Sequence, residues 1–512
     1  MRPSAVVTFI TLLPSLSLAQ APPANSHQAT GVKVGEVTQD SAILWVRHTA
    51  ADCRSHAGLI PGSPEWQMAY DAGLPKDRPD DPEPTGGGKK KKKAGPLIWP
   101  TWISPERLEG NCPGAPGRVR ARYADSEDLS DSAWLDWATV SPETDCSHQF
   151  HLTGLKPDTV YYYETQTSSP EGAPHPGTLR GRFRTAPAPS ENARVRFVVI
   201  TGQHYEKTDL PPTPEAATGD YRSYASMRAL APDFIVPTGD TVYYDSGHRG
   251  AFAFSRAMAR HHWQRVYSLP NVIRFHLDSA GYWEKDDHDT VDNDCWPGAK
   301  LGNLTWPEGL ATFREQVPMG DKTHRTIRWG QALQIWLVEG RDFRSPNTYP
   351  DGPEKTIWGA EQKAWLKRTL LESDASWRVL ISPTPLVGPD RGPSSKADNH
   401  ANLAFQHEGD EMRHWFRDNV ASNFFIVCGD RHWQYHSVHP GTGLHEFSCG
   451  PLTDKHAGGS PGLNPEYHRY HNVIGGFLSV TVEPLPESRS RIAFRHHDTA
   501  GKVLNEAVWP GR

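Results

Sequence analysis

The chain has 512 residues, of which 37% are hydrophobic and 10% aromatic, so it has material for two or more packed domains. This composition excludes a chain that is disordered throughout. The formal net charge of -6 is modest for the length, which argues against wholesale nucleic-acid binding and against a polyanionic tail.

The N-terminus has the pattern of an export signal over residues 1–19. Arg2 supplies a short positive region, Ala5 to Leu18 forms a mostly apolar core, and Ser17-Leu18-Ala19 offers the small residues that signal peptidase accepts. No cysteine follows the core, and no later run reaches the roughly 18 to 20 apolar residues of a membrane span. We therefore expect a secreted or periplasmic protein without a transmembrane anchor.

The cysteine count fits an exported chain. An even number permits disulfides, although six cysteines allow 15 full pairings. We predict that Cys53 pairs with Cys112 and closes an N-terminal insertion. Cys428 ends an apolar run and fits a free buried thiol better.

Residues 29–185 are predicted to form an all-β domain. Short alternating runs surround an insertion at about 51–117, which is dense in proline and glycine and carries Lys89 to Lys93. The lysine run is interpreted as a solvated loop, and the alternative is a cationic patch for an anionic polymer or membrane surface. Gln149 to Thr167 and Gly181 to Thr185 resemble the end of a fibronectin type III-like sandwich.

Residues 194–485 alternate strands with helices, which predicts an α/β domain in two layers or in an α/β/β/α arrangement. The runs read as strands are 195–200, 234–236, 271–277, 333–338, 378–381, 424–427 and 445–447, and those read as helices are 221–231, 251–267 and 360–371. Antiparallel strands at 476–483 and 491–496 close the chain, the second within a C-terminal segment of 486–512.

Polar turns follow four of these runs, where α/β proteins place their chemistry. The turns are T-G-Q-H at 201–204, G-D-T-V-Y at 239–243, D-D-H-D at 286–289 with Asn293 beyond it, and G-D-R-H at 429–432. So many carboxylates in one region repel each other unless cations neutralise them. Each turn alone is a common structural feature, but their order and placement together predict a metal site.

In this order the motifs resemble the metallophosphatase superfamily and, within it, the alkaline phosphatase D (PhoD-like) family. Supporting stretches are W-L-V-E-G-R-D-F-R at 336–344, W-G-A-E-Q at 358–362 and W-R-V-L at 377–380. The resemblance implies a four-layer α/β/β/α metallophosphatase core behind a fibronectin-like domain, and phosphoester hydrolysis as the activity.

The resemblance also implies roles for single residues. It gives two metal sites, with Asp240 bridging them, Tyr243 and His432 on an iron site, and Asp287, Asn293 and Asp430 on a second site that is calcium in better-known members. His288 takes the place of the histidine that stabilises or protonates the transition state. The implied nucleophile is a hydroxide bridging the two metals.

One position departs from the family pattern. The iron-binding cysteine should fall at Gly202, which has no side chain to bind a metal. His204 lies where the wider superfamily has the histidine of an Asp-x-His motif, so we expect it to replace the missing thiolate. The competing interpretation is a weakened site or another ion, and zinc, iron and manganese all suit this set.

Arg341 and Arg431 are candidates to bind the phosphoryl group, because guanidinium matches phosphate geometry. The alternative for both is an ordinary ion pair with a nearby carboxylate. The expected substrate is a phosphoester small molecule or polymer, the expected state is a monomer, and no nucleic-acid-specific binding is expected. Two alternatives stay open: a phosphodiesterase for phospholipid or wall polymer, and a catalytically decayed surface-binding protein.

Overall fold

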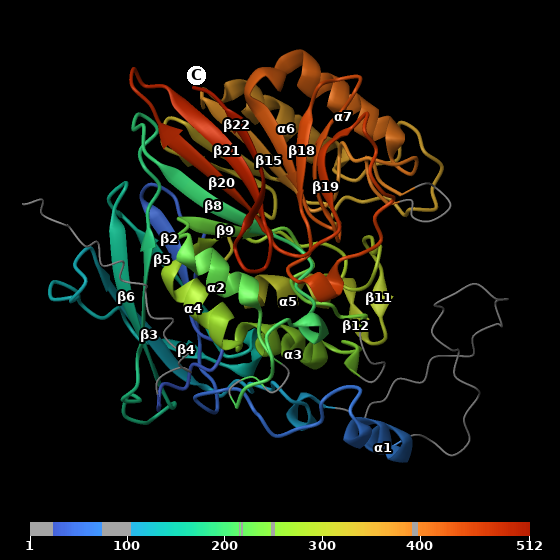
Figure 1. The fold of residues 1–512 in the computed structure, drawn as a ribbon. Coiled ribbons are helices and arrows are strands. Elements are labelled where there is room, and N and C mark those ends of the chain that lie inside the picture. The colour runs from blue at the N-terminus through green and yellow to red at the C-terminus, as the bar shows by residue number, and fades with distance from the viewer. Residues whose placement is uncertain are drawn as a thin grey trace, which may run out of the picture.

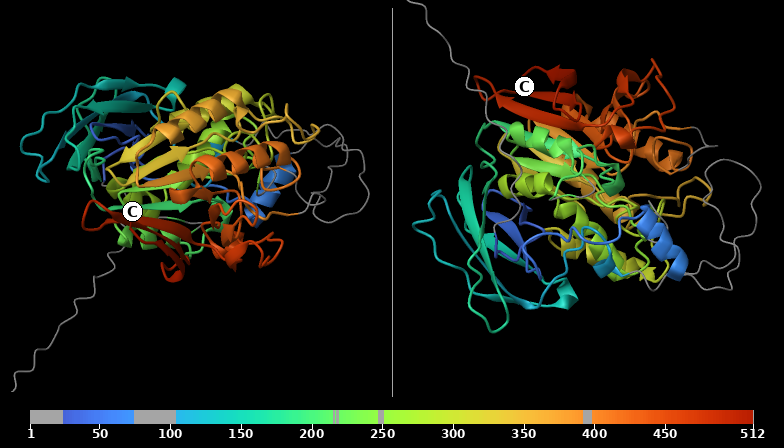
Figure 2. Two further views of the ribbon diagram at one scale, coloured as in Figure 1. Left: turned by 90° about the horizontal axis from the view of Figure 1, so that it is seen from above. Right: turned by 60° about the horizontal axis from the view of Figure 1, so that its bottom comes forward.

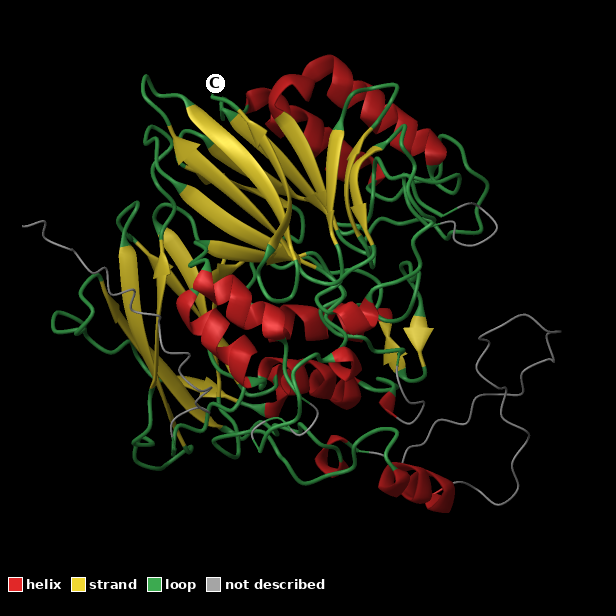
Figure 3. Cartoon of the chain, in the orientation of Figure 1, coloured by secondary structure: helices red, strands yellow, loops and turns green. Residues whose placement is uncertain are grey.

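The structure is a computed structural model that describes residues 24–73, 104–214, 216, 219–246, 251–391 and 398–511. The predicted export signal and the run Lys89 to Lys93 lie outside these residues. Two large sheets lie face to face, with helices on the outer side of each (Figures 1 and 3). The arrangement is therefore the predicted α/β/β/α stack.

The first large sheet has nine strands and contains the strands of both chain ends. In spatial order they are β22 (Val503–Trp509), β21 (Ser490–His497), β20 (Phe477–Pro484), β8 (Val195–Ile200), β9 (Phe234–Pro237), β10 (Ala280–Gly281), β1 (Lys33–Gly35), β2 (Ser41–Arg47) and β5 (Ser147–Thr153). The four central strands from β8 to β1 are parallel. In β8 only Arg196 is not buried, as expected for a parallel strand covered on both faces.

The second large sheet has seven strands. In order they are β13 (Arg325–Trp329), β14 (Leu333–Leu337), β15 (Trp377–Ser382), β16 (Phe424–Cys428), β18 (His445–Cys449), β17 (Gln434–Val438) and β19 (His468–Asn472). The strands β14, β15, β16 and β18 are parallel. A hairpin of β11 (Lys300–Leu301) and β12 (Leu304–Thr305) stands apart from both sheets.

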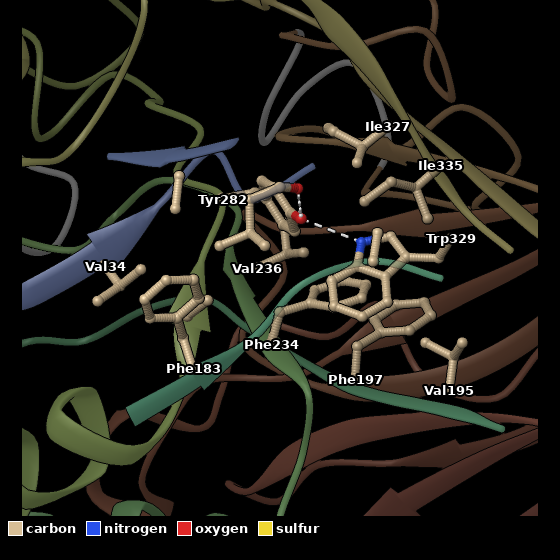
Figure 4. Packing of buried hydrophobic residues seen from close by; sticks show 14 of the residues in the cluster. Val34, Phe183, Val195, Phe197, Phe234, Val236, Tyr282, Ile327, Trp329 and Ile335 are labelled. Atoms are coloured by element: carbon tan, nitrogen blue, oxygen red, sulfur yellow. Dashed lines mark hydrogen bonds between the residues drawn. The ribbon is translucent and has the colours of Figure 1, made fainter. Parts of the chain in front are cut away.

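The main core fills the space between the two sheets. Phe197 and Phe234 from one sheet share this cluster with Ile335 and Trp329 from the other (Figure 4). The polar atoms of Trp329 and Tyr282 in this core are hydrogen-bonded. Trp329 Nε1 donates to the hydroxyl of Tyr282 (3.0 Å), which donates to the backbone carbonyl of Val37 (2.5 Å). A buried Tyr or Trp polar atom that has its partner costs little.

Helices cover the outer faces through two further apolar clusters. The nine-stranded sheet is covered by α2 (Arg222–Ala229), α3 (Arg256–Tyr267), α4 (Pro270–Asp278) and α5 (Trp306–Gln316), and the seven-stranded sheet by α6 (Gly359–Glu372) and α7 (Gln406–Asn419). A separate helix, α1 (Pro64–Gly73), belongs to the N-terminal insertion.

The N-terminal region adds a four-stranded sheet at one flank of the molecule (Figure 2). Its strands are β4 (Ala138–Val140), β3 (Gly117–Ala124), β6 (Val160–Ser168) and β7 (Leu179–Arg184). Val119 and Tyr163 from this sheet pack in one cluster with Leu44 of β2. Because β1 pairs with β10, the opposite layer is continuous with the nine-stranded sheet. A fibronectin type III-like topology stays a prediction.

One predicted strand is wrong. Residues 271–277 form helix α4, with Pro270 in the first turn and Val272, Ile273, Phe275 and His276 buried at helical spacing. A short apolar run does not distinguish a buried strand from a buried helix. The strand before the acidic turn is β10, which has only two residues.

The predicted Cys53–Cys112 disulfide is also wrong, because all six cysteines are free thiols. The Cys112 thiol is buried and donates to the Gly110 carbonyl oxygen (3.6 Å). The ends of the insertion are held instead by a buried ion pair between Arg54 and Glu109 (2.7 Å).

Candidate metal centre

The carboxyl ends of the parallel strands in the two sheets meet at one edge. Thr201, directly after β8, pairs with Pro451, which follows β18 in the other sheet. The backbone N–H of Asp430, after β16, donates to the Thr201 hydroxyl (3.2 Å). Turns from both sheets therefore surround one site, as the sequence predicts.

Two of these turns are Gly-Asp pairs with an unusual backbone. Asp240 and Asp430 both adopt left-handed conformations, with φ of 52° and 58°. Gly239 has a φ of 90°, and a Cβ built on it would lie 2.4 Å from the backbone nitrogen of Asp286. Only glycine allows the two turns to approach so closely, and aspartate is one of the few residues that tolerates the left-handed region next to it.

Asp240, Asp287 and His288 form a cluster that fits a metal ion. One ligand atom from each lies within 4.8 Å of the others. Asp240 Oδ2 accepts from the Tyr243 hydroxyl (2.8 Å), whereas its buried Oδ1 has no hydrogen-bond partner among the described residues. Burial, reinforced by neighbouring carboxylates, raises the pKa of Asp240 well above its ordinary value. A bound cation would give Oδ1 a partner and would stabilise the ionised carboxylate.

His288 is fixed by a carboxylate that the sequence analysis assigned no role. Its Nδ1 lies 2.5 Å from Asp245 Oδ1, which leaves Nε2 available to the site. Burial lowers the pKa of His288, but the carboxylates of Asp245, Asp287 and Asp240 outweigh it and raise this pKa well above its ordinary value. The other oxygen of Asp245 accepts the backbone N–H of Asn293 (2.7 Å).

Asn293 itself is exposed. Asn293 contacts Asp245 through its backbone N–H, so its predicted role as a metal ligand stays a prediction.

The outer carboxylates of the acidic turn hold the turn together. Asp286 Oδ1 is paired with Arg341 Nε (2.5 Å), and Asp289 accepts the backbone N–H groups of Asp286 (2.7 Å) and Thr241 (3.1 Å). Burial raises the pKa of Asp286 to about 8 and that of Asp289 to about 7. Asp287 is left as the carboxylate that this turn directs into the cluster.

Both candidate phosphate-binding arginines are fully buried and paired with carboxylates. Arg341 also lies 3.6 Å from Asp287 Oδ2, and Arg431 contacts Asp390 (3.2 Å), Asp398 (3.3 Å) and Asp430. The ion-pair alternative therefore describes their contacts in the structure. Direct contact with substrate stays a prediction.

Four aromatic side chains surround the predicted iron site. The Tyr243 hydroxyl lies 3.4 Å from His432 Nε2, and the ring of His204 lies 4.7 Å from that of Tyr243. His204 already has contacts for both ring nitrogens, with Ser246 Oγ (2.9 Å) and the N–H of Glu206 (3.2 Å).

The fourth ring belongs to His456, which the sequence analysis missed. Its ring centroid lies 3.9 Å from that of His432, and its Nδ1 lies 3.3 Å from the position that a Cβ on Gly202 would occupy. His456 ends a short turn that follows the parallel strand β18. The sequence analysis looked for polar turns after parallel strands, and the same search over residues 449–456 would have found His456.

The described residues include no helix that is both long and apolar enough to span a membrane.

The chain resembles known phosphatases in sequence and in fold. The sequence model of a family described as PhoD-like phosphatase matches residues 197–475. Alkaline phosphatase D of Bacillus subtilis (strain 168) is 22% identical over 448 residues, which are 76% of this chain and 73% of that protein.

Two solved structures share the fold. A PhoD structure matches with a TM-score of 0.66 at 17% identity, covering 96% of this chain and 90% of that one. The purple acid phosphatase PPD1 from yellow lupin (Lupinus luteus) seeds matches with a TM-score of 0.57 at 9% identity, covering 93% of this chain and 73% of that one.

Proposed function

Because the chain belongs to the PhoD-like phosphatase family and is a phosphoric ester hydrolase, we propose that it is a secreted enzyme that depends on two or more metal ions held at the edge where its two sheets meet. The observation that supports this most directly is the convergence of Asp240, Asp287 and His288 around a buried carboxylate oxygen without a hydrogen-bond partner among the described residues. Secretion is proposed from the sequence of residues 1–19.

The proposed ligands divide into two sets that share Asp240. Asp287, Asn293 and Asp430 offer only oxygen, which suits calcium. Tyr243 and His432 offer a phenolate and an imidazole, which suit iron, zinc or manganese. When bound, such ions neutralise charge on phosphoryl oxygens and activate water.

We propose that His204 and His456 share the role of the missing thiolate at Gly202. His204 is placed by its sequence position and by its contact with the Tyr243 ring, and its Nε2 would exchange the Ser246 hydroxyl for the metal. His456 is placed by its contact with His432 and by the hydrogen bond from its Nδ1 to the Gly202 carbonyl oxygen (3.0 Å), which leaves Nε2 for a metal. Metal analysis of His204→Ala and His456→Ala tests both, and a variant that keeps its full metal content removes that residue from the site.

His288 is proposed to stabilise or protonate the leaving group. Asp245 holds its Nδ1, which leaves Nε2 to carry the proton that the leaving group receives. Arg341 and Arg431 hold the carboxylates of the two turns in place, and in doing so supply positive charge close to where an anionic ester would bind. The prediction for His288→Ala is a large fall in kcat with metal content retained.

The preference for monoesters or diesters is not set by the ligands, because both reactions use the same core. A phosphodiesterase for phospholipid or wall polymer is therefore the second candidate. A catalytically decayed surface-binding protein would need the lysine run outside the described residues, and the built cluster around Asp240 favours catalysis over it.

The test is hydrolysis of a nitrophenyl phosphomonoester and the matching diester at alkaline pH, with chelator and with added calcium. The expected result is turnover that chelator abolishes and calcium restores, and that Asp240→Asn lacks. The ratio of the two rates assigns the subclass. A folded, metal-loaded protein without activity on either ester would refute the proposal for these substrates.

A further inference from the structure

Three histidines from distant parts of the chain meet in the N-terminal region. His27 precedes β1, His48 directly follows β2, and His175 lies in the loop between β6 and β7. The ring centroids of His27 and His175 are 3.9 Å apart, and those of His48 and His175 are 5.5 Å apart. One ring nitrogen from each residue lies within 4.8 Å of the other two.

Backbone carbonyls orient two of these rings. His27 Nδ1 lies 3.1 Å from the Thr49 carbonyl oxygen, and His48 Nδ1 lies 2.8 Å from that of Ala115. Each contact fixes the proton on Nδ1 and leaves the lone pair on Nε2. A carbonyl behind Nδ1 is the usual support of a metal-binding imidazole.

Ring stacking alone does not account for the cluster. The Nε2 atoms of His48 and His175 are both buried, and neither has a hydrogen-bond partner in the described parts of the chain. Leaving a buried polar atom unsatisfied costs about 1–3 kcal/mol. His27 also has a left-handed backbone, with a φ of 51°, which Asp52 stabilises by accepting its N–H (2.9 Å). Two unsatisfied nitrogens and a strained residue at one point are expected of a ligand site.

We propose that His27, His48 and His175 bind a divalent transition-metal ion, Zn²⁺ foremost, at a site separate from the catalytic centre. Three imidazoles are a known part of zinc ligand sets, and Asp52, whose Oδ1 lies 4.0 Å from His27 Nε2, can close the fourth position.

The proposed ion has a structural role. His48 extends from the nine-stranded sheet and His175 from the four-stranded sheet, so one ion fastens the two layers of the N-terminal region to each other. It also fastens the segment that precedes β1, where the described chain begins. Three imidazole ligands distinguish this site from the oxygen-rich catalytic turns, because calcium does not compete for nitrogen ligands.

The experiment measures zinc binding to the untagged full-length protein in excess calcium, by metal analysis after dialysis and by titration. The expected result is one tightly bound equivalent that persists in Asp240→Asn, which perturbs the catalytic centre. His48→Ala should lose that equivalent or bind it at least tenfold more weakly. His151→Ala, at an exposed histidine of β5, is the matched control and should keep it.

A second variant covers a folding failure of His48→Ala. His175→Asn changes a loop residue between two prolines and should show the same loss, with zinc raising the thermal midpoint of the wild type and not of the variant. The proposal is overturned if the wild type binds no zinc beyond what Asp240→Asn removes, or if a folded His48→Ala or His175→Asn binds zinc as tightly as the wild type.

Discussion

The hydrogen bond between Asp245 and His288 gives the sharpest test of the proposed chemistry. Asp245→Asn keeps the size of the side chain and removes its charge, so His288 loses the carboxylate that lies 2.5 Å from its Nδ1. A hydrogen bond to a charged group contributes about 1.5–3 kcal/mol. Because 1.36 kcal/mol corresponds to a factor of ten in rate, we expect kcat to fall about 10- to 150-fold.

The assay compares two leaving groups. If His288 protonates the leaving oxygen, the loss should be larger for phenyl phosphate, whose leaving group is strongly basic, than for nitrophenyl phosphate. Metal content should stay at the wild-type level, since Asp245 is not among the proposed ligands.

Asp292→Asn is the matched control. It removes a nearby charge, and no hydrogen bond joins the Asp292 carboxylate to His288 among the described residues, so its kcat should change little. An equal loss for both leaving groups would show that Asp245 does not act through a proton on His288. An undiminished kcat in Asp245→Asn would refute the positioning role altogether.

Three further predictions concern a close backbone contact, a buried carboxylate and a buried hydrogen bond. Gly239→Ala should abolish activity and lower the thermal midpoint, because its Cβ would lie 2.4 Å from a backbone nitrogen of the acidic turn. The control is Gly154→Ala, at a residue with a φ of 71° and no atom within 4 Å of the added Cβ, which should cost only about 1–2 kcal/mol of backbone strain. Burial raises the pKa of Glu408, but hydrogen bonds from an imidazole, a backbone N–H and a hydroxyl outweigh it and lower this pKa to about 2 from an ordinary 4.5. That stabilisation is present above pH 4.5 and is lost as pH falls towards 2, so urea unfolding should show a loss of about 3 kcal/mol over this window that Glu408→Gln lacks. Tyr282→Phe should lower the free energy of unfolding by about 1–3 kcal/mol, because it leaves Trp329 Nε1 without its partner; an unchanged urea midpoint would contradict this.

Short apolar runs bounded by glycine or polar turns made most of the strands predictable from the sequence. The strands β8, β9, β15 and β16 are almost wholly buried. Apolar runs of this length that end at glycine or polar turns are typical of buried strands. Helix α4 was misread because its apolar residues are crowded into one run. Helix α7 was missed because polar residues dominate it and only a narrow stripe, including Met412 and Phe416, is buried.

The residues of the candidate site also fall into those that the sequence predicts and those that it does not. Asp240 and Asp287 were predictable because they lie in dense motifs at strand ends. Asp245 and His456 were not predicted: the polar turn after β18 could have indicated His456, but neither local sequence shows that Asp245 faces His288 or that His456 packs on His432. The Asp245 contact joins the turns after the neighbouring strands β9 and β10, and the His456 contact joins the turns after the neighbouring strands β16 and β18, so both depend on strand order, which is a property of the tertiary fold.

The pairing of β8 with β20 sets the order in which this chain can fold. Val199 lies beside Leu478, so the central strand β8 keeps an open edge until the last part of the chain has been made. An open edge on a strand as apolar as β8 is a template for aggregation. A chain cut at residue 475, where the family match ends, would expose that edge permanently, although it contains every proposed catalytic residue. Strands β20 to β22 therefore complete the sheet last in chain order, and we expect a chain that lacks them to aggregate.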